Sequence, residues 1–303
     1  MNALLGLFVN NLLPIFLAAG TGYAAAKSLN VAPRPISQIA FYIFSPCLIY
    51  SLLTSNQLNG SAFARMAGFT LVSVFLIGLV AYVLGRLLQF DRRLLVAVLL
   101  TTMFSNAGNY GLSLNLFAFG DEALAYASVY FVTMAILIYT LGVFMASLGS
   151  SSLGEAFLAL FKAPVVYAVV LALLFTEFGL TLPLPLDRTV NLLGDAAIPV
   201  LMVLMGIQLG HAKWDGKTKA LTLTNILRLV VAPAIALGIS WFVGLQGAAR
   251  QAGISESAMP AAVINTVLAT EFNVEPSFVS TVVFVSTLLS PITVTPLLAY
   301  LGA

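Results

Sequence analysis

Ten long apolar segments most limit how this chain can fold. As a helix, each approaches the roughly 20 residues needed to cross a hydrocarbon layer about 30 Å thick. The connections between them are short, and no soluble domain is inserted. The sequence therefore predicts an all-α polytopic membrane protein with ten transmembrane helices, over 4–26, 36–54, 66–88, 94–119, 123–148, 163–182, 190–212, 220–246, 257–273 and 276–301.

Composition excludes most soluble classes of protein. Of the 303 residues, 60% are hydrophobic and 8% are charged, whereas a soluble domain has about 45–50% apolar and about 25% charged residues. This excludes a cytosolic enzyme, a disordered chain and, with a net charge of +2, a nucleic-acid partner. Cys47 and His211 are the single cysteine and histidine, so we expect no disulfide, metal site or cofactor.

The first apolar segment ends in a pattern that faintly resembles a signal-peptidase site, at Ala24-Ala25-Ala26. No Lys or Arg precedes it, and Asn10 and Asn11 interrupt the apolar stretch. We therefore expect a retained first helix.

Basic residues in the connections predict the orientation in the membrane. With the N-terminus outside, nine fall in cytoplasmic connections and three in outer ones. The nine are Lys27, Arg34, Arg86, Arg92, Arg93, Lys162, Lys213, Lys217 and Lys219, and the three are Arg65, Arg188 and Arg250. This asymmetry places both termini outside.

Ten spans divide into two sets of five. Because each set crosses the membrane an odd number of times, the two sets would have opposite orientations. Residues 1–150 would form the first repeat and residues 151–303 the second. Pro46 and Pro199 lie within the second and seventh spans, where we expect helix kinks, and Asn106 and Asn265 lie within the fourth and ninth. Such inverted repeats are typical of transporters.

The sharpest local feature is the run from Phe104 to Ser113 in the fourth span, with two Asn and two Gly in six residues. These residues are poor helix formers. Backbone groups freed inside hydrocarbon must find partners within the protein or a water-filled cavity. We therefore expect an unwound break facing a cavity, the alternative being a continuous helix that uses Gly for packing and Asn for interhelical bonds.

The ninth span has a weaker pattern of the same kind between Met259 and Glu271, centred on Asn265-Thr266. Two broken helices crossing at mid-membrane would bring four half-helix ends together. Their N-terminal ends suit a carboxylate, and their C-terminal carbonyls suit a cation or water.

Few charged residues lie within the spans, and each needs a reason. Arg228 has three possible roles: extension to the interface, pairing with Glu271, or attraction of an anionic substrate. Asp195 and Glu271 are candidates for carrying a proton or a cation. Tyr110 is a candidate for lining the cavity, although membrane helices use Tyr more often in packing.

Several of these runs together resemble the auxin efflux carrier family. They are the Ser45-Pro46 pair, residues 106–112 (NAGNYGL), residues 193–199 (LGDAAIP) and, most specifically, residues 269–276 (ATEFNVEP). The resemblance covers essentially the whole chain. Like the bacterial members of the family, this chain has no large central loop. One departure is Ser113, where the family usually has Pro.

The resemblance implies a fold like that of the bile-acid/sodium symporters. Spans 1, 2, 6 and 7 would form a scaffold (panel) domain, and spans 3–5 with 8–10 a transport (core) domain containing the crossing broken helices 4 and 9. It also implies a bacterial inner-membrane location and a small organic anion as substrate. The asymmetry of basic residues would then make both termini periplasmic. A homodimer is an open alternative for the assembly.

The sequence thus predicts a secondary transporter for a small organic anion, working by an elevator-like motion, and no enzyme. The expected substrate-binding residues are Asn106, Asn109, Tyr110, Gly111, Asn265 and Thr266. The coupling ion would be Na⁺ or H⁺, with Ser105, Asp195 and Glu271 as candidate groups. A sodium-coupled bile-acid-like symporter and a channel are the alternatives.

Overall fold

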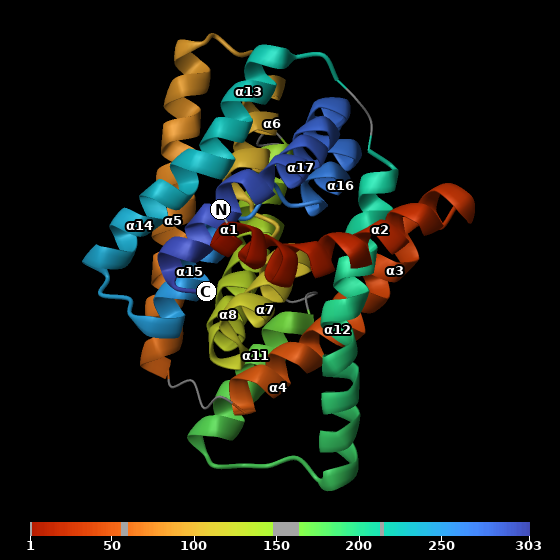
Figure 1. The fold of residues 1–303 in the computed structure, drawn as a ribbon, viewed down its shortest axis with the longest axis vertical. Helices are drawn as coiled ribbons and strands as arrows, with labels where there is room; N and C mark the ends of the chain where they lie inside the picture. Colours follow the sequence, from red (N-terminus) through yellow and green to blue (C-terminus); the bar gives the residue numbers. More distant parts are fainter. Residues whose placement is uncertain (1, 56–59, 148–163, 213–214) are drawn as a thin grey trace.

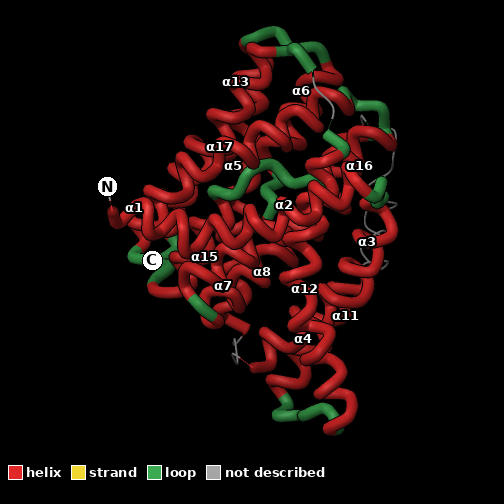
Figure 2. The backbone as a smooth tube through the Cα atoms, turned by 45° about the vertical axis from the view of Figure 1, so that its right-hand side comes forward, coloured by secondary structure: helices red, strands yellow, loops and turns green. Residues whose placement is uncertain are grey.

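A computed structural model describes residues 2–55, 60–147, 164–212 and 215–303. All named elements in these ranges are helical, and Ser105 and Ala261 form an isolated antiparallel bridge. Short loops join the helices (Figure 2). Seven described helices are long and apolar enough to cross a membrane: Ala3–Ser28, Pro33–Ser55, Gly60–Leu87, Asp121–Ala146, Leu184–Gly210, Thr218–Phe242 and Pro276–Leu301. The expectation of a helical integral membrane protein is therefore confirmed.

Four of these seven spans are divided by short π-helical turns and three run as one helix. Their elements follow in chain order. The first two are α1 (Asn2–Leu7), η1 (Phe8–Leu12) and α2 (Leu13–Ser28), then α3 (Pro33–Ile39), η2 (Ala40–Phe44) and α4 (Ser45–Ser55). Next come α5 (Gly60–Leu87), then α8 (Asp121–Leu137), η4 (Ile138–Gly142) and α9 (Val143–Ala146). The last three are α12 (Leu184–Gly210), the series α13 (Thr218–Ile226), η5 (Leu227–Val231) and α14 (Ala232–Phe242), and α17 (Pro276–Leu301).

The three remaining expected spans are not single long helices. The fourth is split into α6 (Arg92–Met103), η3 (Ala107–Leu112) and α7 (Ser113–Phe119), and the ninth into α15 (Gly247–Ser257) and α16 (Ile264–Glu271). The sixth is α11 (Pro164–Glu177), whose expected start at 163 lies outside the described residues. So does the expected boundary between the two repeats, at 150. The ten-span count and the inverted repeat thus stay predictions.

Three of the π-helical turns come just before a proline, for a local steric reason. η1 precedes Pro14, η2 precedes Pro46, and η5 precedes Pro233. Proline lacks an N–H, and its ring crowds the carbonyl four residues earlier. One wider turn, closed by a bond such as that from the Ser45 N–H to the Ala40 carbonyl, accommodates the ring without ending the span.

The two expected kink positions differ in their local structure. Pro46 lies in the first turn of α4, directly after the irregular turn η2. Pro199 lies inside α12, which continues as one helix. A bend at Pro199 stays a prediction.

One group of helices, α2, α3, α4, α11 and α12, lies along the lower and right side of the molecule (Figure 1). Within it, α2 and α12 pack at short range. An added Cβ on Gly206 would overlap the carbonyl of Ala19, so only glycine allows this approach. Small residues commonly serve such close packing between membrane helices.

A second group contains α5, α6, α8 and α13 to α17, with α5, α13 and α14 on the left in Figure 1. α1 contacts α17, so the chain begins and ends on the same side of the molecule (Figures 1 and 2). The split helices of the fourth and ninth segments belong to this group. The split helices meet on the side of this second group that faces α12, where η3 contacts α12.

The expected start of the ninth span, at 257, is wrong. Its first half, α15, covers Gly247–Ser257, most of which the sequence placed in an outer connection. α15 is a polar helix, with the sequence GAARQAGISES, and residues Ala252 to Ser257 are all buried. A search for apolar segments misses such a helix because protein, and not lipid, surrounds it.

Candidate functional site

The fourth and ninth segments are interrupted where they meet. Between α6 and η3 lie residues 104–106, and between α15 and α16 lie residues 258–263. The Asn106 N–H donates to the Pro260 carbonyl at 2.8 Å, and the Ala262 N–H donates to the Phe104 carbonyl at 2.9 Å. Each break thereby supplies the hydrogen-bond partners that the other lacks, as a buried backbone requires. Both expected breaks are present, and the continuous-helix alternative is wrong.

The fourth break is shorter than the expected unwound run from Phe104 to Ser113. Only residues 104–106 leave the helix, and the chain then rewinds through the π-helical turn η3 directly into α7. The Gly111 N–H donates to the Asn106 carbonyl at 3.0 Å, which closes the first wide turn. α7 starts at Ser113, so the break forms without the family's proline at that position.

Two side chains provide further hydrogen bonds at the breaks. The Asn265 Nδ2 donates to the Phe104 carbonyl at 3.3 Å. The Ala261 N–H donates to the Ser286 Oγ at 3.2 Å. Asn265 and Ser286 are fully buried, so these bonds act in a low-dielectric environment.

Arg228 lies at the carbonyl ends of both first halves. Its guanidinium donates to the Thr102 carbonyl, near the end of α6, at 2.6 Å and to the Ser257 carbonyl, at the end of α15. The side chain is 2% exposed, and no carboxylate of the described residues lies within ion-pair distance of it. Extension to the interface and pairing with Glu271 are therefore both wrong. The positive charge compensates the partial negative charge of two helix C-termini.

A cavity of about 900 Å³ lies next to the crossing. The breaks and the starts of the second halves form one wall, which includes Ser105, Asn106, Asn109 and Thr266. Residues of α3, η2 and α12 form the facing wall. The cavity thus lies between the two groups of helices.

A chain of side-chain hydrogen bonds spans this cavity. The Asn109 Nδ2 donates to the Gln208 Oε1 at 3.1 Å, and the Gln208 Nε2 donates to the Ser37 Oγ at 3.4 Å. All three residues line the cavity and are partly exposed to it. They join η3 to α12 and α3.

The wall at the crossing favours negative charge in two ways. η3, continuing into α7, begins at Ala107, and α16 begins at Ile264; both residues line the cavity. Helix N-termini carry partial positive charge, although the N–H groups of Ala107, Asn265 and Thr266 here already donate to the carbonyls of Ser105, Ala262 and Val263. Asn106 and Asn109 add amide donors. A carboxylate can accept from these amides and is attracted by the charge of the helix starts.

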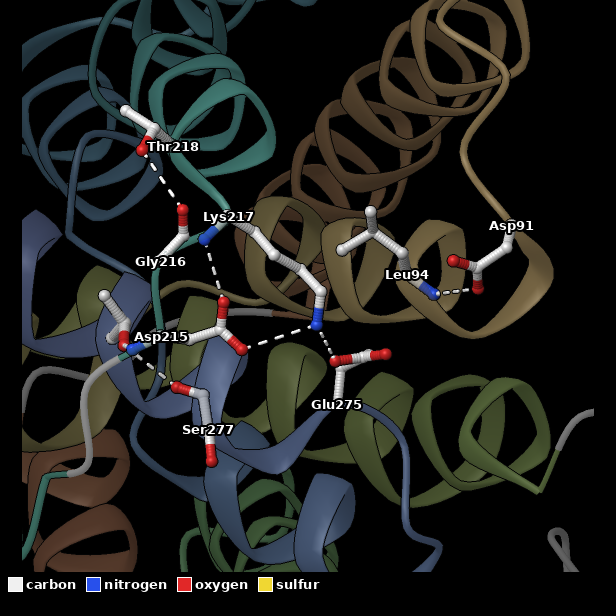
Figure 3. Close-up of polar contacts among 9 residues, drawn as sticks. Asp91, Leu94, Asp215, Gly216, Lys217, Thr218, Glu275 and Ser277 are labelled. Atoms are coloured by element: carbon white, nitrogen blue, oxygen red, sulfur yellow. Dashed lines mark hydrogen bonds and ion pairs between the residues drawn. The ribbon is translucent and has the colours of Figure 1, made fainter.

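Ionisable side chains lie at the rim of the cavity. Arg34, His211 and Glu271 belong to its lining. Close to them, Lys217 extends between Asp215 and Glu275 (Figure 3). It lies 3.3 Å from the Asp215 carboxylate and also pairs with Glu275, which raises the pKa of the Lys217 amine, chiefly through the Glu275 hydrogen bond.

This ion-pair group joins two connections. Lys217 and Asp215 precede α13, while Glu275 precedes α17. The Asp215 N–H also donates to the Thr281 Oγ1, within α17, at 2.7 Å. The contacts fix the start of α13 to the α16–α17 turn, beside Pro276 and Ser277 of the cavity wall.

Comparison with known proteins decides the family. The family model described as "membrane transport protein" matches residues 7–155 and 150–298, nearly the whole chain. The chain belongs to this membrane transport protein family. This family comprises the auxin efflux carriers, so the resemblance found in the sequence is confirmed.

Two archaeal relatives of this membrane transport protein match over most of their length. An uncharacterized transporter of Methanothermobacter thermautotrophicus is 25% identical over 257 residues, 84% of each chain. An uncharacterized transporter of Methanocaldococcus jannaschii is 23% identical over 262 residues, 84% of this chain and 85% of its own. Both are transporters and not enzymes, as is the family.

A plant relative matches over a shorter stretch. Auxin efflux carrier component 6 of Arabidopsis thaliana is 27% identical over 140 residues. The match covers 44% of the membrane transport protein described here and 25% of the plant chain.

In the membrane transport protein, only part of the expected site faces the cavity. Ser105, Asn106, Asn109, Thr266 and Glu271 line it. The other expected residues lie outside the lining, namely Tyr110, Gly111, Asn265 and Asp195.

The residues outside the lining have identifiable surroundings. Tyr110 is fully buried, packs edge-on against Phe16 with ring centroids 5.9 Å apart, and accepts a hydrogen bond from Ser290 at 3.3 Å. Asn265 lies outside the cavity lining and donates a hydrogen bond to the Phe104 carbonyl in the fourth break. Asp195 is exposed on α12.

Sequence reasoning missed two polar residues of this transporter. Gln208 was not singled out, although a glutamine within an apolar helix is a usable signal. Glu256 was placed in an outer connection, yet it is fully buried in the last turn of α15. Its carboxyl lies against Gly111, where an added Cβ would overlap the carboxyl oxygens. The sequence contains no usable signal for Glu256, because only the structure shows that its short polar helix is buried by protein.

Proposed function

We propose that this protein is a secondary transporter that moves a small organic anion, with a carboxylate as the expected class, by an elevator-like alternating-access motion. One observation carries the proposal: two broken helices cross beside a cavity of about 900 Å³, with a buried guanidinium behind the crossing. Transport itself follows from the family. The charge of the substrate and the motion are our inference.

The charge of the substrate is inferred from the electrostatics of the crossing. Arg228 is buried without an ion-pair partner among the described side chains, and a charge in a low-dielectric interior acts over a longer range than one in water. The helix starts at Ala107 and Ile264 add partial charge of the same sign. An anion in the cavity would meet favourable potential from all three.

Three residues are proposed to contact the substrate: Asn106, Asn109 and Thr266. Each lines the cavity near a helix start. The two Asn amides offer hydrogen-bond donors, and the Thr266 hydroxyl, which donates to the Val263 carbonyl at 2.8 Å, would have to turn from it to the substrate. Asn265, Tyr110 and Gly111 are proposed to act indirectly, because they position the breaks and η3 from outside the cavity.

The two groups of helices are the natural candidates for the scaffold and the moving domain. α2, α3, α4, α11 and α12 would stay fixed, and the group that contains the crossing would carry the substrate across. The Asn109–Gln208 hydrogen bond joins the two groups at 3.1 Å. An elevator motion would have to break it.

The orientation is proposed from the basic connections. The rim residues Arg34 and His211 lie next to connections that the charge asymmetry places in the cytoplasm. With periplasmic termini in a bacterial inner membrane, the cavity would open inward. The structure would then correspond to a cytoplasm-facing state.

A sodium-coupled symporter is the alternative. Sodium would seek carbonyl oxygens at the half-helix C-termini, but Arg228 already binds two of them. Sodium-dependent thermal stabilisation of the purified protein would favour this alternative, since a ligand that binds only the folded state stabilises it.

A thermal-shift screen tests the class of substrate. Purified protein is heated with small carboxylates and, as matched controls, with their uncharged amides. We expect stabilisation by at least one carboxylate and not by its amide, with the effect lost in Asn109→Ala and kept in Asn191→Ala, a variant of α12 outside the cavity. Stabilisation by amides and carboxylates alike would contradict an anion site.

A further inference from the structure

Glu256 is the buried acid that the proposed binding site does not use. It is 0% exposed, and its Oε1 accepts a hydrogen bond from the Asn115 Nδ2 at 3.1 Å. The Asn115 Oδ1 is itself held by the Ser255 Oγ at 2.8 Å, which fixes the direction of the amide. The Oε2 of Glu256 has no hydrogen-bond donor among the described residues.

This environment favours the neutral acid over the carboxylate. An ionised carboxylate with one amide donor and a bare oxygen would carry a large desolvation cost. The last turn of a helix, where carbonyl ends carry partial negative charge, adds to that cost. A group so placed holds a proton and releases it only when its surroundings change.

The ionisable groups that face Glu256 are few. Tyr130 of α8 shares a hydrogen bond of 3.2 Å with the Ser257 hydroxyl and lies within electrostatic reach of both Glu256 and Arg228. Tyr110 of η3 is turned to Ser290. α7 and α14 have no ionisable side chain. The others on packed elements are exposed or partly so: Arg65, Tyr82 and Arg86 of α5, Asp121, Glu122 and Tyr126 of α8, Arg250 of α15 and Tyr300 of α17.

Glu256 is also mechanically connected to the cavity wall. Its carboxyl lies against Gly111 without space for a Cβ between them. Gly111 belongs to η3, the same turn that presents Asn109 to the cavity. On its other side, Glu256 adjoins Ser257, whose carbonyl accepts from Arg228.

We propose that Glu256 is the proton-binding site of this transporter, and that a proton and the organic anion bind together and are carried together. This inference rests on the proposed function. With a proton on Glu256, the positive charge of Arg228 is uncompensated and attracts the anion. Loss of the proton places a negative charge one residue from the Arg228 contact and weakens that attraction. Because coupling between two sites is reciprocal, the bound anion holds the proton equally.

The two acids expected from the sequence are less suited to this role. Asp195 and Glu271 are both exposed, whereas Glu256 is enclosed by protein. Asp195 therefore serves as a matched control for variants of Glu256.

Infrared spectroscopy of the purified protein in lipid nanodiscs tests the protonation directly, with no substrate. At neutral pH we expect the C=O band of a protonated carboxyl in the wild type and in Asp195→Asn, and its loss in Glu256→Gln. Asn115→Leu, which keeps the acid and removes its amide donor, should shift the band. A band that persists in Glu256→Gln, or that is missing from the wild type, would overturn the assignment.

Proteoliposomes test the coupling, with a radiolabelled carboxylate that stabilises the wild type. A 1:1 symporter supports about tenfold accumulation per unit of inward acid gradient at zero membrane potential. We expect this of the wild type and of Asp195→Asn. Glu256→Gln should exchange label at equal pH and accumulate none.

The outcomes separate the two proposals. Two results would overturn proton coupling and leave anion transport intact. In the first, the wild type exchanges the labelled carboxylate but a pH gradient causes no accumulation. In the second, Glu256→Gln accumulates the labelled carboxylate in response to the gradient. A wild type that exchanges no carboxylate overturns the proposed function, while the infrared band still decides whether Glu256 holds a proton.

Discussion

The backbone N–H of Asn106 donates to the carbonyl of Pro260 at 2.8 Å, which joins the break in the fourth segment to the break in the ninth. Neither break could persist alone within a membrane, because its polar backbone would have no partner. Joined, the two breaks end four half-helices at one place. Arg228 binds the two carbonyl ends, and the cavity meets the two N–H ends.

Arg228 should separate the effects of charge and of hydrogen-bond geometry. Arg228→Gln removes the charge, so we expect at least about tenfold weaker anion binding, equivalent to 1.4 kcal/mol. It should also lose about 3 kcal/mol of stability, because two bonds from a charged donor disappear. Arg228→Lys keeps the charge and should bind the anion better than Arg228→Gln. Equal affinity in Gln and Lys variants, measured by titration calorimetry, would show that charge is unimportant here.

A cross-link between Phe41 and Tyr139 should stop transport. Their ring centroids lie 5.4 Å apart and join η2 to η4, which continues α8, so an elevator motion of the two groups of helices must separate them. The pair is replaced by cysteines in a Cys47→Ser background, since Cys47 is the single native cysteine. We expect a bifunctional thiol reagent to abolish anion exchange and a reducible one to allow recovery. The single Phe41→Cys variant is the control, and full exchange by the cross-linked pair would exclude relative motion here.

Gly111→Ala should be destabilising because the new Cβ would overlap the Glu256 carboxyl. Overpacking of a buried site costs about 1–3 kcal/mol. Combining it with Glu256→Ala should recover part of that loss, so a double-mutant cycle from thermal denaturation should show a coupling energy above about 0.5 kcal/mol. Additive losses would mean that the two groups do not press on each other.

Lys217 predicts a pH-dependent contribution to stability. Glu275 and Asp215 raise its folded-state pKa above 10.5. The stabilisation is therefore complete below the unfolded-state pKa and is lost as pH rises through the folded-state value. The Lys217 side chain is 39% exposed, so the whole effect should stay below about 1 kcal/mol. Lys217→Met should melt slightly below the wild type at neutral pH and converge with it as pH rises through the raised folded-state pKa of Lys217. A gap that widens with rising pH would contradict this sign.

Local chemistry explains which features the sequence predicts. Asn and Gly between Ser105 and Gly111 are poor helix formers, and this intrinsic property is legible without a structure. The start of η3 at Ala107 cannot be predicted from the sequence, because it depends on hydrogen bonds between the two breaks. These bonds are accepted by the carbonyls of Pro260 in the ninth break and Phe104 in the fourth. The expected substrate residues thus divide: Asn109 faces the cavity, and Tyr110, its neighbour, faces away.

Burial by protein explains what the sequence hides. Glu256 sits in a helix too polar for lipid, so a reading based on apolar length assigns it to solvent. Arg228 sits in an apolar segment, and its carbonyl partners at Thr102 and Ser257 come from distant parts of the chain. Tertiary packing, which no local pattern contains, decides both cases.

Counterflow in proteoliposomes tests the central claim most directly, namely that the cavity beside the crossing carries the substrate. Vesicles loaded with an unlabelled carboxylate, diluted into labelled carboxylate, should show transient label accumulation with the wild type and with Asn191→Ala, and none with Asn106→Ala. Equal counterflow by Asn106→Ala and the wild type would contradict the claim.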